Sequence, residues 1–280
     1  MHAHNAAMHL ERSLPLVLQQ DYPTFEVLVV VDNCTDLTVE RLQLMEQSWP
    51  SLRHLILPSS SWHPDRHRLA MALGAKSASY DWIMALQPDF APHSTHWLRL
   101  MAEALGDDTE SVISFCGFED NDEDSSKAQF YSVFEQQLCL PFYRPSCDDS
   151  NVLTRRDLVL HDSPIIIQPL LHPQASVHRV IPYGDLWWKQ YKNALRRSLA
   201  SRGWELRTLH FLSVWSHPVI LVLCIALSLL TWWWAGIIPY ALHIIVTAFS
   251  LNSFARRVGE KKFYFTYWWQ TLTMPLEQWK

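Results

Sequence analysis

Several features that mark other classes of protein are missing from this chain. Its 280 residues carry a formal charge of −5, so bulk charge does not favour nucleic-acid binding. The cysteines are odd in number and none are spaced as CxxC, which argues against a disulfide framework and favours reduced cytoplasmic thiols. They are Cys34, Cys116, Cys139, Cys147 and Cys224.

The N-terminus also lacks a secretion signal. Met1–Asn5 has neither a basic segment nor an apolar run of the kind that a signal peptide requires. We therefore expect the first half of the chain to stay in the cytoplasm.

Charge is missing from one long C-terminal segment. Thr208–Ala255 contains no Asp, Glu, Lys or Arg. A transmembrane helix needs roughly 20 consecutive, predominantly apolar residues. The segment predicts two spans, Val214–Trp234 and Ile237–Phe254, with Gly236 and Pro239 at the turn. The alternative is a buried helical hairpin of a soluble protein.

Basic residues flank this apolar segment on both sides. The turn between the predicted spans has no charge, so the positive-inside rule places both ends in the cytoplasm, with Trp232–Trp234 at the far interface. Asp185–Arg207 and Phe263–Trp279 are predicted to be helices lying on the cytoplasmic membrane surface. The basic residues are Arg196, Arg197, Arg202 and Arg207 before the spans and Arg256, Arg257, Lys261 and Lys262 after them.

The first part of the chain alternates helical and strand patterns. Phe25–Val31 is an apolar, β-branched run that ends at Asp32 and Asn33, which predicts a buried strand followed by a polar loop. Ligands of open α/β sheets bind at such carboxyl ends. Further strands are expected at Leu52–Pro58, Tyr80–Leu86 and Ser111–Phe118, and helices at Asn5–Gln20, Val39–Trp49, Asp65–Ser79, Ser94–Leu105 (starting at a serine cap) and Phe130–Phe142.

The order of residues around this strand resembles family 2 glycosyltransferases. Gln19–Pro23, Phe25–Val27 and Val31–Thr38 follow the family's pattern "QDYPxFEVIVVDDGSTDxT" in order and spacing. The resemblance is good over residues 5–105 and weak over 106–205. It implies a GT-A-like, Rossmann-type nucleotide-binding α/β sandwich, followed here by the transmembrane helical hairpin.

The resemblance also implies domain boundaries, and it implies that the family's first strand is missing. It implies a glycosyltransferase-like domain at 1–185, an interfacial amphipathic helix at 186–212, two transmembrane helices at 213–255 and a cytoplasmic interfacial tail at 256–280. The family's first strand is expected to be missing, with only His4–Ala7 as a remnant. Its absence would leave a hole in the core, unless the start of the chain lies upstream of Met1.

The resemblance implies that five residues contact the nucleotide-sugar donor: Asn5, Asp32, Arg68, Gln87 and Gln190. Asp32 corresponds to the base-contacting Asp, or is a simple loop or cap residue, and Asn5 matches a nucleotide contact whose following Glu is Ala6 here. Arg68 replaces a lysine and would suit phosphate, or is a solvated helix-face residue. Asp36 is expected to cap the following helix.

The family's metal motif is incomplete. "TDADxxP" becomes Leu86–Pro92, in which Asp89 is kept and Gln87 replaces the first Asp. Because Mg²⁺ and Mn²⁺ favour oxygen ligands, Asp89 could hold a divalent metal on the diphosphate with weakened affinity. The alternative is a helix cap.

The remaining chemistry is poorly matched. The candidates for the general base are Asp162 and Asp149, and either is equally readable as a loop residue. Gln190 is what remains of a QxxRW motif, with Asn193 and Ala194 in place of Arg and Trp; an interfacial helix is the simpler interpretation.

These matches predict a transferase anchored in the cytoplasmic membrane with its soluble domain facing the cytoplasm. It would move a sugar, with inversion by analogy, from a nucleotide-sugar donor to a lipid-linked or polysaccharide acceptor. The alternative is a catalytically impaired relative that binds a partner or ligand without turnover, because several family positions are changed together.

Overall fold

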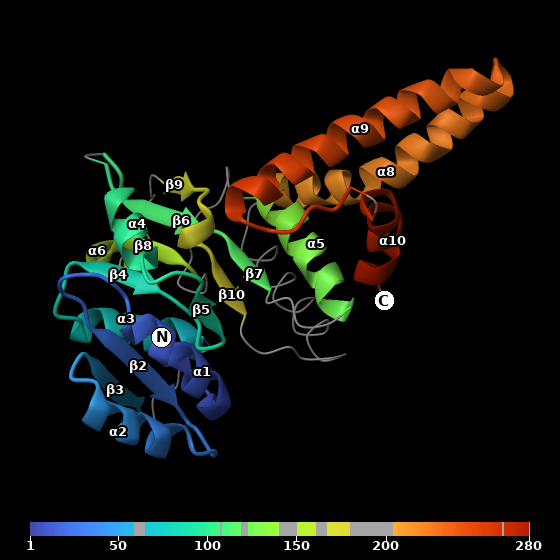
Figure 1. The fold of residues 1–280 in the computed structure, drawn as a ribbon. Helices are drawn as coiled ribbons and strands as arrows, with labels where there is room; N and C mark the ends of the chain where they lie inside the picture. Colours follow the sequence, from blue (N-terminus) through green and yellow to red (C-terminus); the bar gives the residue numbers. More distant parts are fainter. Residues whose placement is uncertain are drawn as a thin grey trace. The chain divides into compact units, whose positions relative to one another are not determined.

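The computed structural model describes residues 1–58, 65–106, 108–118, 123–139, 150–160, 167–179, 204–264 and 266–279. The chain divides into two compact units (Figure 1). Unit 1 comprises Met1–Glu119 and Tyr143–Ile181, and unit 2 comprises Asp120–Phe142 and Pro182–Lys280.

Unit 1 begins with a parallel sheet in the order β1-β2-β3. Its middle strand is valine-rich and almost entirely buried, as expected for a strand covered on both faces. Because parallel neighbours need crossovers, helices connect the strands, which confirms the predicted alternation. The elements are β1 (His2–Ala3), α1 (Ala7–Leu18), β2 (Val27–Asp32), α2 (Thr38–Ser48), β3 (Leu52–Leu57) and α3 (Arg66–Ser77).

The expectation that the first strand is missing is wrong, although the strand is very short. His2 pairs with Val30 and Ala3 with Val31, and the Met1 amine donates to the Leu28 carbonyl at 2.8 Å. Two residues are too few to extend β1 along the whole of β2.

A cavity lies beside β2, although the strand whose absence was expected to leave a hole is present. A cavity of about 490 Å³ lies next to β2, lined by Met1, Leu28 and Gly74, and by residues of β4 (Trp82–Ala85) and α4 (Trp97–Glu103). The sheet that contains β4 is separate from the sheet that contains β2, so the cavity lies between two strands that do not pair.

The described part of unit 1 contains two further sheets. One has the order β4-β8-β6-β9 and the other β5-β10-β7. The predicted strand Ser111–Phe118 is two strands, one in each sheet, interrupted at Phe115. The further elements are β5 (Phe90–Pro92), β6 (Ser111–Ser114), β7 (Cys116–Phe118), β8 (Val152–Arg155), α6 (Arg156–Leu160), β9 (Ile167–Leu170), the 3₁₀ turn η2 (Pro173–Ala175) and β10 (Val177–Arg179).

The predicted serine cap of α4 is wrong. The helix begins at Trp97 after His96, whose own side chain does not cap it; the Leu98 amide donates to the Gln20 side chain at 3.1 Å. Ser94 instead accepts a hydrogen bond from the His96 amide in the turn before the helix.

Asn151 connects several parts of unit 1. It is fully buried, and its side chain accepts from the Trp97 indole at 2.8 Å and donates to the carbonyls of Phe115 at 2.9 Å and Ala175 at 3.0 Å. Its φ of 63° is a left-handed conformation that asparagine tolerates better than most residues. One side chain thus joins α4, the β6–β7 connection and η2.

Unit 2 is helical. The two long apolar helices pack along each other (Figure 1), and both are long and apolar enough to cross a membrane. The elements are α5 (Glu123–Cys139), α8 (Trp204–Leu230), α9 (Trp233–Val258) and α10 (Tyr267–Trp279). Of the predicted surface helix Asp185–Arg207, only Trp204–Arg207 is described, and it belongs to α8.

The turn of this hairpin differs from the prediction. It lies at Thr231–Trp232, whereas Gly236 and Pro239 are inside α9. A Cβ built on Gly236 would lie 1.8 Å from the Cys224 carbonyl oxygen. Gly236 therefore allows the two helices to approach closely, a role that small residues commonly have between apolar helices.

Candidate functional site

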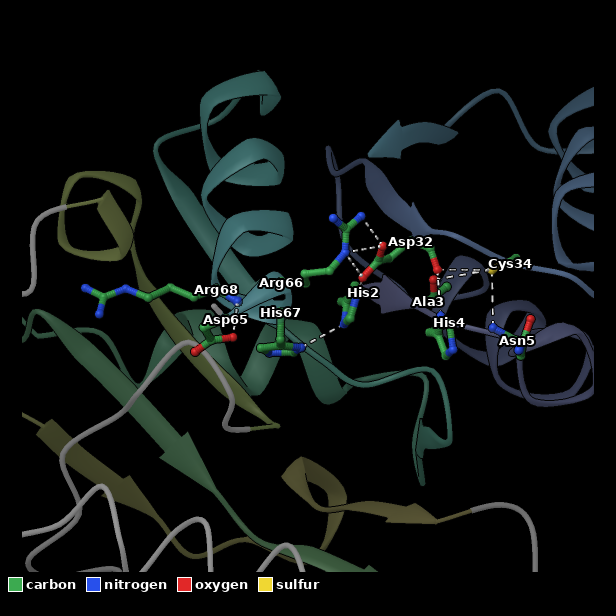
Figure 2. Close-up of polar contacts among 10 residues, drawn as sticks. All are labelled: His2, Ala3, His4, Asn5, Asp32, Cys34, Asp65, Arg66, His67 and Arg68. Carbon is green, nitrogen blue, oxygen red and sulfur yellow. Dashed lines mark hydrogen bonds and ion pairs between the residues drawn. The ribbon is translucent and has the colours of Figure 1, made fainter. Parts of the chain in front are cut away.

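The polar residues of unit 1 gather where β1 and β2 end and α3 begins (Figure 2). Asp32 is the last residue of β2, and its side chain is only 7% exposed. Arg66, in the first turn of α3, donates from Nε to both carboxylate oxygens, at 2.8 and 3.1 Å. The His2 ring lies 3.4 Å from the same carboxylate.

These contacts keep Asp32 ionised. Hydrogen bonds from Arg66 lower the pKa of Asp32, against an opposing contribution from burial. Burial and the neighbouring His67 lower the pKa of His2, so this imidazole is neutral at pH 7. The cluster therefore holds one negative charge, which is already paired with a guanidinium.

Two histidines extend the network across to α3. The Nδ1 atoms of His2 and His67 are 2.8 Å apart, so one ring donates to the other, and their ring planes meet edge-on. Figure 2 shows Arg66 and His67 approaching Asp32 and His2 from the helix side. The start of α3 is fixed by Asp65, whose carboxylate accepts from the Arg68 amide.

Residues of the loop after β2 form hydrogen bonds with the residues at the start of α1. Asn5, at a φ of 50°, accepts from the Thr35 amide at 2.8 Å and donates its own amide to the Cys34 sulfur at 3.2 Å. Asp36 accepts from the amides of both Ala7 and Thr38. The residue at the N-cap position of α2 is Leu37 rather than the predicted Asp36, but the Asp36 carboxylate satisfies the first amide of both α1 and α2.

The arginine that pairs with Asp32 is Arg66, which the sequence did not single out. Figure 2 shows the Arg68 side chain directed away from Asp32. Arg66 and Arg68 are two positions apart, and such residues do not share a helix face. The proximity of Asp32 and Arg66 depends on how α3 packs against β2, and no local motif signals it.

Asp89 also contacts an arginine. Its carboxylate lies 2.8 Å from Nε of Arg179, and both side chains are largely buried. Arg179 ends β10, where it pairs with Phe90 of β5 and Phe118 of β7. The guanidinium carbon lies 4.9 and 5.3 Å from the centroids of these two rings, within cation–π range.

The described residues do not fit a divalent metal at Asp89. Its carboxylate is already paired with a cation, and Gln87 offers a neutral amide in place of the motif's first carboxylate. Gln87 has a structural role through its backbone, which donates to Ser150 Oγ and accepts from Phe90. Within the described parts of the chain, no three His, Cys, Asp or Glu side chains form a group that could hold a metal.

Three predicted site residues, Asp149, Asp162 and Gln190, lie outside the described residues. The sequence also missed residues that the fold brings to the site. His2 precedes Asp32 by 30 positions, and Arg66 follows it by 34. A basic residue opening the helix after β3 was the only available signal for Arg66.

Comparison with known proteins identifies the family. The model of the family described as glycosyl transferase family 2 matches residues 1–161. No curated protein sequence matches the chain.

Solved structures give the fold. The mannosyltransferase PcManGT from Pyrobaculum calidifontis, in complex with GDP-Man and Mn²⁺, matches with a TM-score of 0.51 at 15% identity, over 98% of this chain and 85% of that one. S. aureus TarS 1–349 in complex with UDP-GlcNAc matches 43% of this chain and 34% of that one, with a TM-score of 0.37 at 18% identity. The α/β part thus has a GT-A-like fold, to which two long apolar helices are added.

Proposed function

The chain belongs to glycosyl transferase family 2, and on that premise we propose that it moves a sugar from a nucleotide-sugar donor to a lipid-linked or polysaccharide acceptor. Inversion at the sugar carbon is part of the proposal by analogy with the family. The observation that carries it is Asp32, a buried, ionised carboxylate at the carboxyl end of the central strand, where open α/β sheets bind ligands.

The donor end of this site would be built by α1, β2 and α3. In the proposal, Asp32 accepts a hydrogen bond from the nucleobase, and Asn5 contacts the nucleotide from the start of α1. Arg68 and Gln87 remain predicted donor contacts. Because Arg66 already uses both oxygens of Asp32, nucleobase binding requires Arg66 to share or release this carboxylate.

Transfer also needs a base that removes the proton of the acceptor hydroxyl. Asp162 and Asp149 remain the candidates for this base, and Gln190 the candidate for positioning donor and acceptor. A divalent metal at Asp89 also remains a prediction, and it has a stated condition: Arg179 must first leave the Asp89 carboxylate.

We propose further that unit 2 anchors the protein in the cytoplasmic membrane. Many apolar side chains of α8 and α9 are exposed, such as Leu229 at 83% and Phe249 at 66%. Transfer of these side chains from water into lipid would be favourable. The domain boundaries proposed are 1–185, 186–212, 213–255 and 256–280. The last segment contains α10, whose exposed Trp268 and Trp269 suit a membrane interface.

This orientation can be tested by labelling with a membrane-impermeant thiol reagent. We expect Thr231→Cys, at the hairpin turn, to react from outside intact cells. Lys262→Cys, after α9, should react only after the cells are opened. Labelling of Lys262→Cys in intact cells would contradict cytoplasmic placement of the soluble domain.

A second candidate function is supported by one specific observation. Both carboxylates expected to serve the donor, Asp32 and Asp89, are paired with arginines of the chain itself, Arg66 and Arg179. A relative that has lost turnover would tolerate such pairing. The alternative is therefore a glycosyltransferase-like membrane protein that binds a partner or ligand without catalysis.

Nucleotide binding followed by turnover separates the two functions. The detergent-purified protein should bind UDP or GDP in calorimetric titration, and Asp32→Asn should weaken binding about tenfold or more, since a hydrogen bond to a charged group is worth roughly 1.5–3 kcal/mol. Asp21→Asn is the matched control, because Asp21 is exposed and pairs with Arg99. If the protein binds UDP or GDP but releases no nucleotide when it is supplied with nucleotide sugars, the second function is favoured.

A further inference from the structure

Arg179 and Asp89 form an ion pair without a well-directed hydrogen bond from the Arg179 Nε–H. The two groups are 2.8 Å apart, yet the Nε–H of Arg179 is not aimed so as to form a hydrogen bond. The guanidinium also lies against the rings of Phe90 and Phe118, on the two strands that flank β10. A cation in contact with aromatic neighbours can turn its N–H groups to another anion without leaving its place.

Residues of α1 lie near this pair. His9, in the first turn of α1, lies close enough to sense the charges of Asp89, Arg179 and Arg12. Among the described residues, the guanidinium groups of Arg179 and Arg12 therefore lie on the same side of unit 1 as Asp89 and could meet the negative charge of a diphosphate.

The cluster lies near the Asp32 site. Ala6 directly precedes α1, and its amide donates to the Thr38 hydroxyl at the start of α2, in the segment that follows β2. His9 lies three residues further on, roughly 5 Å along the helix. The start of α1 thus contacts both the segment after Asp32 and the surroundings of Asp89 and Arg179.

We propose that Arg179, assisted by Arg12, neutralises the donor diphosphate in place of a divalent metal, and that Asp89 holds Arg179 until the donor binds. The inference rests on the proposed function and assigns its charge neutralisation. It follows from the donor set: one paired carboxylate and an amide make a poor Mg²⁺ or Mn²⁺ site, whereas guanidinium groups bind phosphate oxygens well.

The test is titration of the detergent-purified full chain with UDP and GDP, once in EDTA and once in Mn²⁺. We expect at least one nucleotide to bind with the same affinity in both conditions, within about threefold. Arg179→Gln should weaken binding in EDTA about tenfold or more, the loss expected for a charge-assisted hydrogen bond, and Arg179→Lys should recover part of it. Arg99→Gln, which removes an exposed arginine paired with Asp21, should change nothing.

Asp89→Asn decides the matter because the two interpretations predict opposite results. If Asp89 only holds Arg179, the variant binds nucleotide in EDTA as well as or better than the parent protein. If Asp89 holds a metal, the variant loses binding that depends on Mn²⁺. Thermal unfolding of each variant verifies that it is folded.

A titration with Mn²⁺ alone, followed by the electron paramagnetic resonance of free Mn²⁺, gives a second readout. We expect no saturable site that Asp89→Asn removes. Such a site, or nucleotide binding that requires Mn²⁺, would overturn this inference and leave the proposed function standing. Failure of both nucleotides to bind a folded protein in either condition would overturn the proposed function and this inference with it.

Discussion

Replacing Asn151 by alanine should destabilise unit 1 more than any exposed polar substitution. The change removes three side-chain hydrogen bonds and leaves the Trp97 indole and the carbonyls of Phe115 and Ala175 without their partner. Each buried group left unsatisfied costs about 1–3 kcal/mol, and the left-handed backbone adds about 1 kcal/mol for a residue that tolerates it less well. The sum is roughly 4–10 kcal/mol, comparable to the whole stability of a typical domain.

Asn5→Ala is the matched control for this prediction. Asn5 has the same residue type and a similar left-handed φ of 50°, but its hydrogen bond to Thr35 is exposed. We expect it to cost no more than about 2 kcal/mol. Both variants would be compared by thermal and urea-induced unfolding, followed by circular dichroism. Equal losses of stability in the two variants would refute the idea that Asn151 joins the sheets.

Three further perturbations test the packing and charge of the fold. Gly74→Ala should stabilise unit 1 by about 1 kcal/mol, because alanine is the better helix former and its Cβ would meet Val30 at an ordinary 3.4 Å beside the cavity; a lower melting temperature would contradict this. Gly236→Ala should loosen the α8–α9 hairpin, since the new Cβ would collide with the Cys224 carbonyl, and faster proteolysis at the hairpin would reveal it; unchanged protease resistance would count against the close approach. In a chain that begins at Met1, burial lowers the pKa of the terminal amine from 8.0 to about 6; the folded state then binds fewer protons than the unfolded state between these pH values, so stability falls by about 2 kcal/mol as the pH drops from 8 to 6. An Nα-acetylated chain should lack this contribution to the pH dependence of unfolding, and identical curves for both forms would show that the amine is not buried.

The local elements were largely readable from sequence. The apolar run before Asp32 and the helical spacing of α1, α2 and α3 record which faces are buried, so periodicity alone predicts them. The ends of elements were less readable. The turn of the apolar hairpin lies at Thr231–Trp232, because Gly236 serves close helix contact rather than chain reversal. Ser94 was a plausible cap, but the helix starts at Trp97, whose indole is fixed by Asn151.

The sequence by itself determined the family resemblance, the order of helices and strands in the α/β part and the apolar C-terminal segment. These follow from residues close together in the chain, where spacing and composition are informative. Only the tertiary structure decided which charges meet: Arg66 is 34 positions from Asp32, and Arg179 reaches Asp89 because β10 pairs with β5. Strand register and helix packing set such pairs, and local sequence does not encode them. For this reason the carboxylates were predicted, and the arginines that hold them were found only in the fold.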